Sequence, residues 1–258
     1  MFERIREELR NIEQTHGVKI LYACESGSRA WGFPSKDSDY DVRFIYVHKP
    51  DWYLAIDQQS DVIELSLDDG VLDMSGWDLR KTLQLYRKSN PSLQEWLESP
   101  IVYLEQDDFL HNMLQLQDEV FSPYVCFHHY LSMAENTYMN YLMEDEVRAK
   151  KYFYALRPIF ACWWIEENGT MPPIPFDELL DSSVPRETPL YEAISELLFA
   201  KMQNDEQDVV PKNRLLNMFI SECVEEFHEY AKTLEKTNHD VTPLLNRFFM
   251  HTLKKAWK

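Results

Sequence analysis

Residues 25–42 read ESGSRAWGFPSKDSDYDV, and the chain continues as RFIYV to Val47. Only six glycines occur in the chain, and two of them, Gly27 and Gly32, fall in this stretch. Because glycine has no side chain, a Gly-Ser turn can bring backbone N–H groups and the Ser28 hydroxyl close to an anion. The β-branched and aromatic residues that end the stretch predict a strand over 39–47. We therefore expect an anion-binding turn, a loop and then a strand.

Two aspartates open the predicted strand. Asp39 and Asp41 are two residues apart, so both carboxylates are expected on one face of the strand. Two like charges at this distance repel unless a cation lies between them. Mg²⁺ prefers hard oxygen ligands and combines carboxylates with substrate phosphates. Although an Asp-x-Asp sequence alone is more often a solvated turn, the upstream Gly-Ser turn favours nucleotide phosphoryl chemistry.

The Gly-Ser turn followed by Asp-x-Asp between apolar residues resembles the signature of polymerase-β-type nucleotidyltransferases. The segments GSRAWGFPSKDSDYDVRFIYV, LDMSGWDLRKTLQLYRKSNPSLQEWLESPIVY and AKKYFYALRPIFACWWI are similar to predicted bacterial nucleotidyltransferases whose relatives include partners of RNA-repair ligases. The similarity extends from about Tyr22 to Trp164.

The resemblance implies transfer of a nucleoside monophosphate from an NTP to a hydroxyl, with release of pyrophosphate. It implies two Mg²⁺ ions, with Mn²⁺ as an alternative, held by Asp39, Asp41 and a third carboxylate from a neighbouring strand. Matching the motif assigns the third position to Asp73, and Gly27 and Ser28 would hold the triphosphate of the NTP. Three other acidic residues are substitutes for Asp73: Asp61, Glu64 and Asp78.

The hydrophobic periodicity predicts an α+β (mixed α/β) protein with two domains. Strands are expected at 18–24, 39–47, 61–67, 71–75 and 101–104. Helices are expected at 2–15, from Trp77 to about 90, and then at 107–120, 123–146, 148–166, 187–203, 211–236 and 243–257. We therefore predict a catalytic nucleotidyltransferase domain with a small mixed sheet over 1–105 and an all-helical domain over 106–258.

Composition limits the classes of partner. The chain has 258 residues and a formal net charge of −18, which argues against extended nucleic-acid binding through bulk electrostatic attraction. A short RNA end, a small hydroxylated molecule and a protein side chain all stay open as acceptors. The N-terminus lacks a signal peptide and no apolar run is long enough to span a membrane, so we expect a cytoplasmic protein without a membrane partner. The four cysteines are expected to be reduced thiols.

Two windows contain basic residues and no acidic residue, at 79–94 and 147–165. In the second window, Lys150, Tyr154 and Arg157 share one face of the predicted helix, beside Lys151. This face could hold triphosphate oxygens or the pyrophosphate, or it could be a solvated face that pairs with acids elsewhere. Arg29 could likewise contact phosphate or pair with a nearby acid.

Three functional hypotheses remain. The first is a Mg²⁺-dependent nucleotidyltransferase. The second is a catalytically silent module that binds an NTP or an RNA end, although the complete set of carboxylates counts against it. The third is an enzyme of the toxin–antitoxin type that modifies a protein hydroxyl, which differs from the first in its acceptor.

Overall fold

A computed structural model describes residues 1–203, 208–236 and 240–258. By its internal contacts the chain divides into two compact units. Unit 1 contains residues 1–27 and 39–120 together with the C-terminal helix α12 (Thr242–Ala256). Unit 2 contains residues 28–38 and the chain from Phe121 through α11 (Arg214–Ala231).

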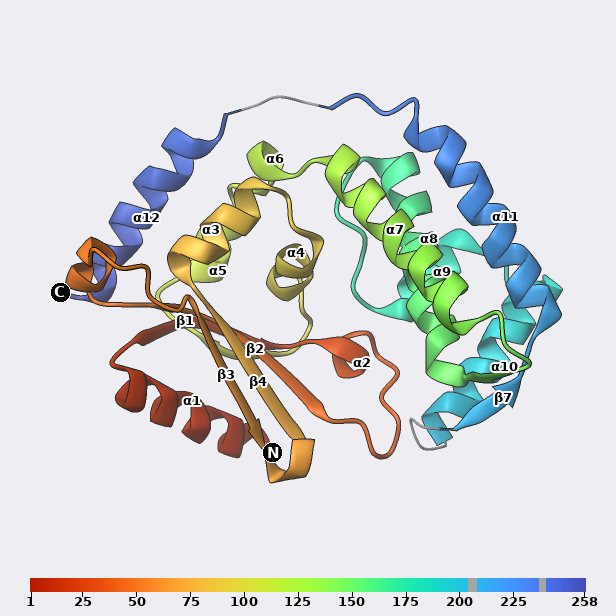
Figure 1. Ribbon diagram of the computed structural model, residues 1–258, viewed down its shortest axis with the longest axis horizontal. Helices are drawn as coiled ribbons and strands as arrows, with labels where there is room; N and C mark the ends of the chain where they lie inside the picture. The colour runs from red at the N-terminus through yellow and green to blue at the C-terminus, as the bar shows by residue number, and fades with distance from the viewer. Residues whose placement is uncertain (204–207, 237–239) are drawn as a thin grey trace. The chain divides into compact units, whose positions relative to one another are not determined.

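Unit 1 is built on a five-stranded sheet in the order β3-β4-β2-β1-β5 (Figure 1). The strands are β1 (Lys19–Glu25), β2 (Tyr40–Val47), β3 (Val62–Leu67), β4 (Leu72–Asp78) and β5 (Val102–Glu105). The central strands β2 and β4 are parallel, whereas the other neighbouring pairs are antiparallel. The sheet is therefore mixed, and β2 and β4 begin at the same edge.

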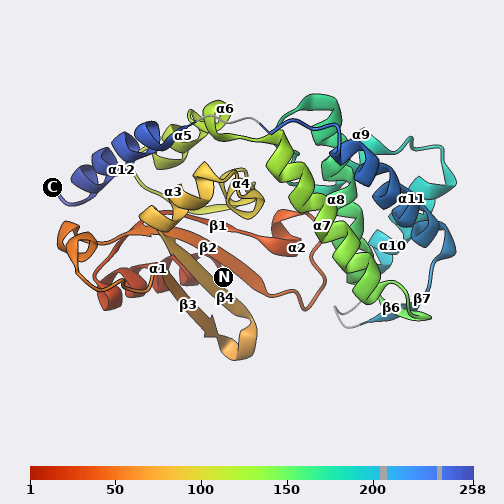
Figure 2. The same cartoon turned by 45° about the horizontal axis from the view of Figure 1, so that its top comes forward.

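Helices cover both faces of this sheet. Helix α1 (Phe2–His16) buries Ile5, Leu9 and Ile12 against one face, because these residues recur at helical spacing. On the other face lie α3 (Leu79–Arg87), α4 (Pro91–Leu97), α5 (Phe109–Leu114) and α12, as Figure 2 shows. The short helices η1 (Pro50–Leu54), η2 (Asp68–Gly70) and α6 (Gln117–Val120) complete the unit.

Gly76 explains how β2 and β4 pack so closely. It pairs in register with Phe44, and a Cβ atom at Gly76 would lie 2.1 Å from the Phe44 ring. Any larger residue would therefore have to displace a buried ring in the centre of the sheet.

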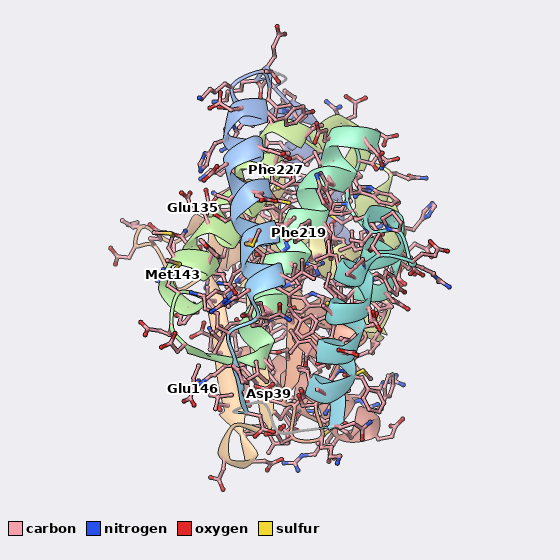
Figure 3. The ribbon with its side chains drawn as sticks, turned by 90° about the vertical axis from the view of Figure 1, so that its right-hand side faces the viewer. Asp39, Glu135, Met143, Glu146, Phe219 and Phe227 are labelled. Carbon is pink, nitrogen blue, oxygen red and sulfur yellow. The ribbon has the colours of Figure 1, made fainter. Side chains whose placement is uncertain are left out.

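Unit 2 is mainly helical. It contains α7 (Pro123–Tyr141), α8 (Ala149–Asn168), α9 (Phe176–Ser183), α10 (Pro189–Gln203) and α11, with a two-stranded sheet of β6 (Glu146–Arg148) and β7 (Val209–Pro211). Phe219 and Phe227 of α11 pack against Trp163 of α8, with ring centroids 5.6 and 6.1 Å apart (Figure 3). Glu135 of α7 pairs with His228 of α11 at 3.3 Å.

Residues 28–38 begin with the rest of α2 (Gly27–Ala30) and then follow an irregular path. Phe33, 1 % exposed, belongs to the aromatic core of unit 2, where its ring lies 5.2 Å from Phe153 and 5.4 Å from Phe176. This loop of the signature stretch is therefore part of the helical unit's core.

The predicted α+β class is confirmed, and each of the five predicted strands is present. Some predicted boundaries are wrong: Trp77 lies inside a longer β4, which ends at Asp78, instead of opening a helix, and the helix over 107–120 is divided into α5 and α6. The strands β6 and β7 and the helix α9 were not predicted. Helix α8 continues through Pro158.

The division by contacts differs from the predicted boundary at residue 105. Helices α5, α6 and α12 belong to unit 1, because they cover its sheet, and residues 28–38 belong to unit 2. The four cysteines are free and buried. No helix among the described residues is long and apolar enough to cross a membrane.

Candidate functional site

The parallel pair β2 and β4 places two predicted site residues side by side. Asp41 pairs in register with Asp73, so their side chains project from the same face at the edge where both strands begin. Asp41 is 25 % exposed and Asp73 is 42 % exposed, so solvent reaches both carboxylates. The two residues are 32 positions apart in the sequence, and the parallel pairing of β2 with β4 brings them together.

Arg43 lies between these two carboxylates. One of its terminal nitrogens donates to Oδ1 of Asp41 and the other donates to Oδ2 of Asp73, both at 2.8 Å. The guanidinium therefore stabilises two like charges that would otherwise repel. Sequence reasoning missed Arg43, although its position two residues after Asp41 on a strand places it on the same face.

Asp39 lies one residue before β2, and its side chain is partly exposed. In the described part of the chain, no three His, Cys, Asp or Glu side chains converge as a ready metal site. The third-carboxylate substitutes lie elsewhere: Asp61 pairs with Lys81 at 2.9 Å, and Glu64 is opposite Ser75.

Asp78, the last of these substitutes, is buried at the start of α3. It accepts hydrogen bonds from the Tyr53 hydroxyl at 2.7 Å and from the backbone N–H of Arg80 at 2.8 Å. Burial raises the pKa of its carboxyl above the usual value. Asp78 thus caps a helix, which is a structural role.

Glu25, at the end of β1, supports Asp41 from behind. Its side chain is fully buried, and its Oε1 accepts a hydrogen bond from the backbone N–H of Asp41 at 2.8 Å. Its Oε2 accepts from the hydroxyl of Tyr103 on β5. These contacts join β1, β2 and β5 behind Asp41, so the position of Asp41 is fixed by three strands.

Gly27 is required by both its conformation and its neighbour. Its φ is +60°, in the left-handed region that favours glycine, and a Cβ atom there would lie 2.2 Å from Oδ2 of Asp41. The backbone of the Gly-Ser turn therefore approaches the Asp41 carboxylate closely. The role of this turn in holding triphosphate stays a prediction.

Ser28 and Arg29 hold the two ends of the following loop together. The Ser28 hydroxyl donates to Oγ of Ser38 at 3.2 Å, and Arg29 donates to the carbonyl oxygen of Ser38 at 2.6 Å. Ser38 also accepts from the backbone N–H of Ser35 at 2.8 Å. A role of Ser28 and Arg29 at substrate phosphate stays a prediction beside this structural one.

The loop of residues 28–38 packs against the predicted basic face of α8. The Arg157 guanidinium lies 4.8 Å from the centre of the Trp31 ring, and Tyr154 meets the same ring edge-on at 5.6 Å. Arg157 is only 2 % exposed, so it belongs to the interior, whereas Lys150 and Tyr154 are partly exposed. Trp31 thereby couples residues 28–38 to α8 within unit 2.

Lys151 lies between two aromatic rings. Its ammonium group is 3.7 Å from the centre of the Tyr141 ring and 5.4 Å from that of Tyr154. Burial, with smaller contributions from Lys150 and Arg148, lowers the pKa of Lys151. The cluster offers cations to an anionic ligand, and its contact with substrate stays a prediction.

Residues 1–251 match the model of the RNA repair pathway DNA polymerase beta family, RlaP. The chain belongs to this family. It is 48 % identical over 258 residues to the uncharacterized protein YcgL of Bacillus subtilis (strain 168). The alignment covers all of this chain and 98 % of YcgL. The match to the RlaP family therefore extends over nearly the whole chain.

Two solved structures are more distantly similar. Spectinomycin adenyltransferase AAD(9) from Enterococcus faecialis, crystallised with ATP and spectinomycin, aligns with a TM-score of 0.47 and 11 % identity over 88 % of this chain and 97 % of that one. A nucleotidyltransferase-like protein from Exiguobacterium sibiricum 255-15 aligns with a TM-score of 0.31 and 12 % identity over 89 % and 75 %.

Proposed function

We propose that this chain is a nucleotidyltransferase, which transfers a nucleoside monophosphate from an NTP to a hydroxyl group and releases pyrophosphate. The observation that carries the proposal is the in-register pair Asp41 and Asp73, which share one cation and lie against the Gly27 turn. Membership of the RlaP family supports the same reaction class.

The donor set of this site fits a divalent metal. Asp41 and Asp73 already share the positive charge of Arg43, and carboxylate oxygens are the ligands that Mg²⁺ and Mn²⁺ favour. Asp39, Asp41 and Asp73 would hold two such ions. When bound, the metal would polarise the phosphoryl group and make the acceptor hydroxyl a better nucleophile. Glu25 fixes the backbone of Asp41 and so limits the positions that its carboxylate can take.

The chain's own residues would bind and orient the nucleotide. The backbone at Gly27 and the hydroxyl of Ser28 are proposed to hold triphosphate oxygens, because a turn with positive φ presents N–H groups to an anion. Arg43 is proposed to donate to a phosphate oxygen when the carboxylates hold a metal ion, because its guanidinium would then not be needed to neutralise them. Lys150 and Lys151 are proposed as further phosphate contacts, and Arg29 and Arg157 as residues that hold the loop carrying Ser28.

The acceptor is proposed to be a hydroxyl on a short RNA end. The family description names RNA repair, and a net charge of −18 is compatible with gripping a short terminus, although it disfavours binding along an extended strand. A small hydroxylated molecule and a protein hydroxyl are the other two acceptors to be tested.

One experiment tests the proposal. The purified protein is incubated with each labelled NTP, Mg²⁺ and one of three acceptors: short RNA, a small-molecule extract or a protein extract. We expect the label to enter RNA with release of pyrophosphate. The double substitution Asp39→Asn and Asp41→Asn, and Asp73→Asn alone, should each abolish transfer. Asp61→Asn is the matched control, because Asp61 pairs with Lys81 away from this site, and it should retain activity.

Two outcomes would contradict the proposal. Transfer at the wild-type rate by the Asp39/Asp41 double variant would exclude these carboxylates from the reaction. Loss of transfer in Asp61→Asn with normal transfer in Asp73→Asn would assign the third carboxylate to a different strand. Circular dichroism on each variant separates lost chemistry from lost fold.

A second function is favoured by one observation. Arg43 neutralises Asp41 and Asp73 internally, as a cation built into the chain would do in a module that binds an NTP or RNA end without turnover. Calorimetry that detects binding of Mg-NTP, with no product formed from any of the three acceptors, would select this alternative.

A further inference from the structure

A cavity lies in unit 1, away from the carboxylate pair. It has a volume of about 330 Å³ and is enclosed by α5, α12 and the start of β1. Its lining includes Leu21, whereas Glu25, which contacts Asp41, ends the same strand. The two residues are four positions apart, about 13 Å along β1. In Figure 1, α12 and α5 lie beside the start of β1, and α2 follows its end.

The cavity wall is apolar. Phe109, Leu116, Leu244 and Phe248 line it together with Leu21. Phe109 and Phe248 come from different helices, and their ring centroids are 5.9 Å apart. A cavity of this size with aromatic walls is typical of a small-molecule site, and these surfaces suit a flat ring.

Basic residues outnumber acidic ones in the cavity lining, where Asp107 is the one carboxylate among the described residues. Arg247, His251 and Lys255 recur every four residues on α12 and therefore share one face of that helix. Among the described residues, neither Arg247 nor His251 has a carboxylate within ion-pair distance, in a protein where acidic residues outnumber basic ones by 44 to 26. Lys255 donates to the carbonyl oxygen of Asp107 at 2.9 Å and lies 3.8 Å from its carboxylate. Two unpaired basic side chains beside an apolar cavity form a ready anion site.

The third part of the lining can form specific hydrogen bonds. Gln106 carries a carboxamide, which both donates and accepts, and no partner for its side chain is found in the part of the chain that the structure describes. Asn112 and Gln115 also line the cavity, although their amide nitrogens already contact the carbonyl oxygen of Asp108 at 2.7 Å and Nε2 of His111 at 2.9 Å. Carboxamide groups match the alternating donors and acceptors on the edge of a nucleobase.

We propose that this cavity binds a nucleoside monophosphate group, with the base against the ring of Phe248 and the phosphate at Arg247 and His251. The apolar walls, the carboxamides and the basic residues of α12 each fit one part of such a ligand. The group can come from a free mononucleotide or from the terminal nucleotide of an RNA. The site is separate from Asp41 and Asp73, so it does not depend on the proposed transfer reaction.

The test measures AMP binding by calorimetry in the presence of EDTA, which keeps the metal-dependent site empty. We expect binding that Arg247→Ala weakens at least about tenfold, because a charged hydrogen bond to phosphate is lost. Lys254→Ala is the matched control: it removes one positive charge from an exposed position of the same helix that does not line the cavity, so binding should change less than about twofold. Asp41→Asn should leave AMP binding unchanged. Hydrogen exchange should slow in α5 and α12 when AMP is added.

Titration with different ligands distinguishes a free nucleotide from an RNA end, and a nucleotide from a fatty acid. Binding of a five-nucleotide RNA with a terminal phosphate, weakened by Arg247→Ala to the same degree, would assign the site to an RNA end, and binding of AMP alone would assign it to a free nucleotide. Three results would overturn the proposal: no AMP binding at millimolar concentration, equal losses in Arg247→Ala and Lys254→Ala, or binding of decanoate in place of AMP. A failure of the transfer reaction would leave this result untouched, because the binding assay contains no metal.

Discussion

Replacing Arg43 with methionine tests whether its guanidinium occupies the position that a metal ion would take. Methionine keeps most of the length of the side chain but removes the charge and its hydrogen bonds, of which the two to the carboxylates of Asp41 and Asp73 are 2.8 Å long. It also removes the weaker contacts with the carbonyl oxygens of Val42 and Asp73. Without divalent metal, the substitution leaves two carboxylates facing each other on neighbouring strands.

The expected loss of unfolding free energy depends on how exposed the two carboxylates are to solvent. The contact with Asp41, which is 25 % exposed, contributes about 1.5 kcal/mol. The contact with Asp73, at 42 % exposure, is screened by solvent and contributes about 0.5 kcal/mol. Two carboxylates about 5 Å apart repel by about 1 kcal/mol at a dielectric constant between 40 and 80. The free energy of unfolding should therefore fall by about 3 kcal/mol, which lowers Tm by roughly 6–12 °C.

The same reasoning predicts the opposite effect on metal binding. In the wild-type protein, Mg²⁺ must break the bridge of about 2 kcal/mol, whereas in Arg43→Met the carboxylates are already free. The dissociation constant for Mg²⁺ should fall about 30-fold. Calorimetric titration with Mg²⁺ and thermal melting with and without the ion measure both effects. Added Mg²⁺ should restore the lost Tm of the variant.

Lys81→Met is the matched control. Lys81 makes one bridge to Asp61 at 2.9 Å, with 28 % and 34 % of the two side chains exposed, and it does not contact Asp41 or Asp73. It should lose a little stability and bind Mg²⁺ as the wild type does. If Arg43→Met bound Mg²⁺ no tighter than the wild type, the view that the guanidinium and the metal compete for the same carboxylates would be refuted.

Three further predictions concern other parts of the chain. Gly27→Ala should destabilise the protein by about 1–3 kcal/mol and weaken Mg²⁺ binding, since the new Cβ would meet the Asp41 carboxylate at a backbone conformation unfavourable for alanine. Thermal melting measures the loss of stability and calorimetry the loss of Mg²⁺ binding. Wild-type values in both measurements would contradict the close approach of Gly27 to Asp41. Lys201 is 4 % exposed and donates to the carbonyl oxygen of Phe33 at 2.6 Å, so Lys201→Met should make residues 28–38 more sensitive to limited proteolysis; an unchanged cleavage rate would show that the core aromatics alone hold the loop. Burial lowers the pKa of His48 to about 4, so its contribution to stability is complete above about pH 6.5 and is lost as the pH falls towards 4; His48→Gln should flatten urea-derived unfolding free energies over this range, and an identical pH slope in the two proteins would exclude His48 as the cause.

Several features of the site could be predicted from local sequence because their physical cause is local. The spacing of Asp39 and Asp41 and the strand residues after them predicted where the strand would lie, and β2 begins within one residue of that prediction. The Gly-Ser turn beside the acids follows from the absence of a side chain at Gly27, which lets the backbone come within contact distance of Asp41.

Other features depended on contacts between distant segments. Arg43 was overlooked because its role needs Asp73, which reaches it only when β4 pairs in parallel with β2. The strand predicted over 18–24 stopped one residue short of Glu25, yet Glu25 is buried in β1 and accepts hydrogen bonds from Asp41 and Tyr103. The basic residues of α12 form a third acid-free window over 241–258 that sequence reasoning did not use.

The sequence by itself determined the α+β class, the order of the main elements and the family resemblance, because hydrophobic periodicity and short motifs act over a few residues. Tertiary structure decided which distant charges meet and which unit each segment joins. Phe33 buries its ring in the helical core of unit 2, and α12 covers the sheet of unit 1 almost at the other end of the chain. Burial of apolar surface drives the packing of both Phe33 and α12. Which apolar faces are left to be covered depends on how all the helices and strands assemble, so no single segment of the sequence determines it.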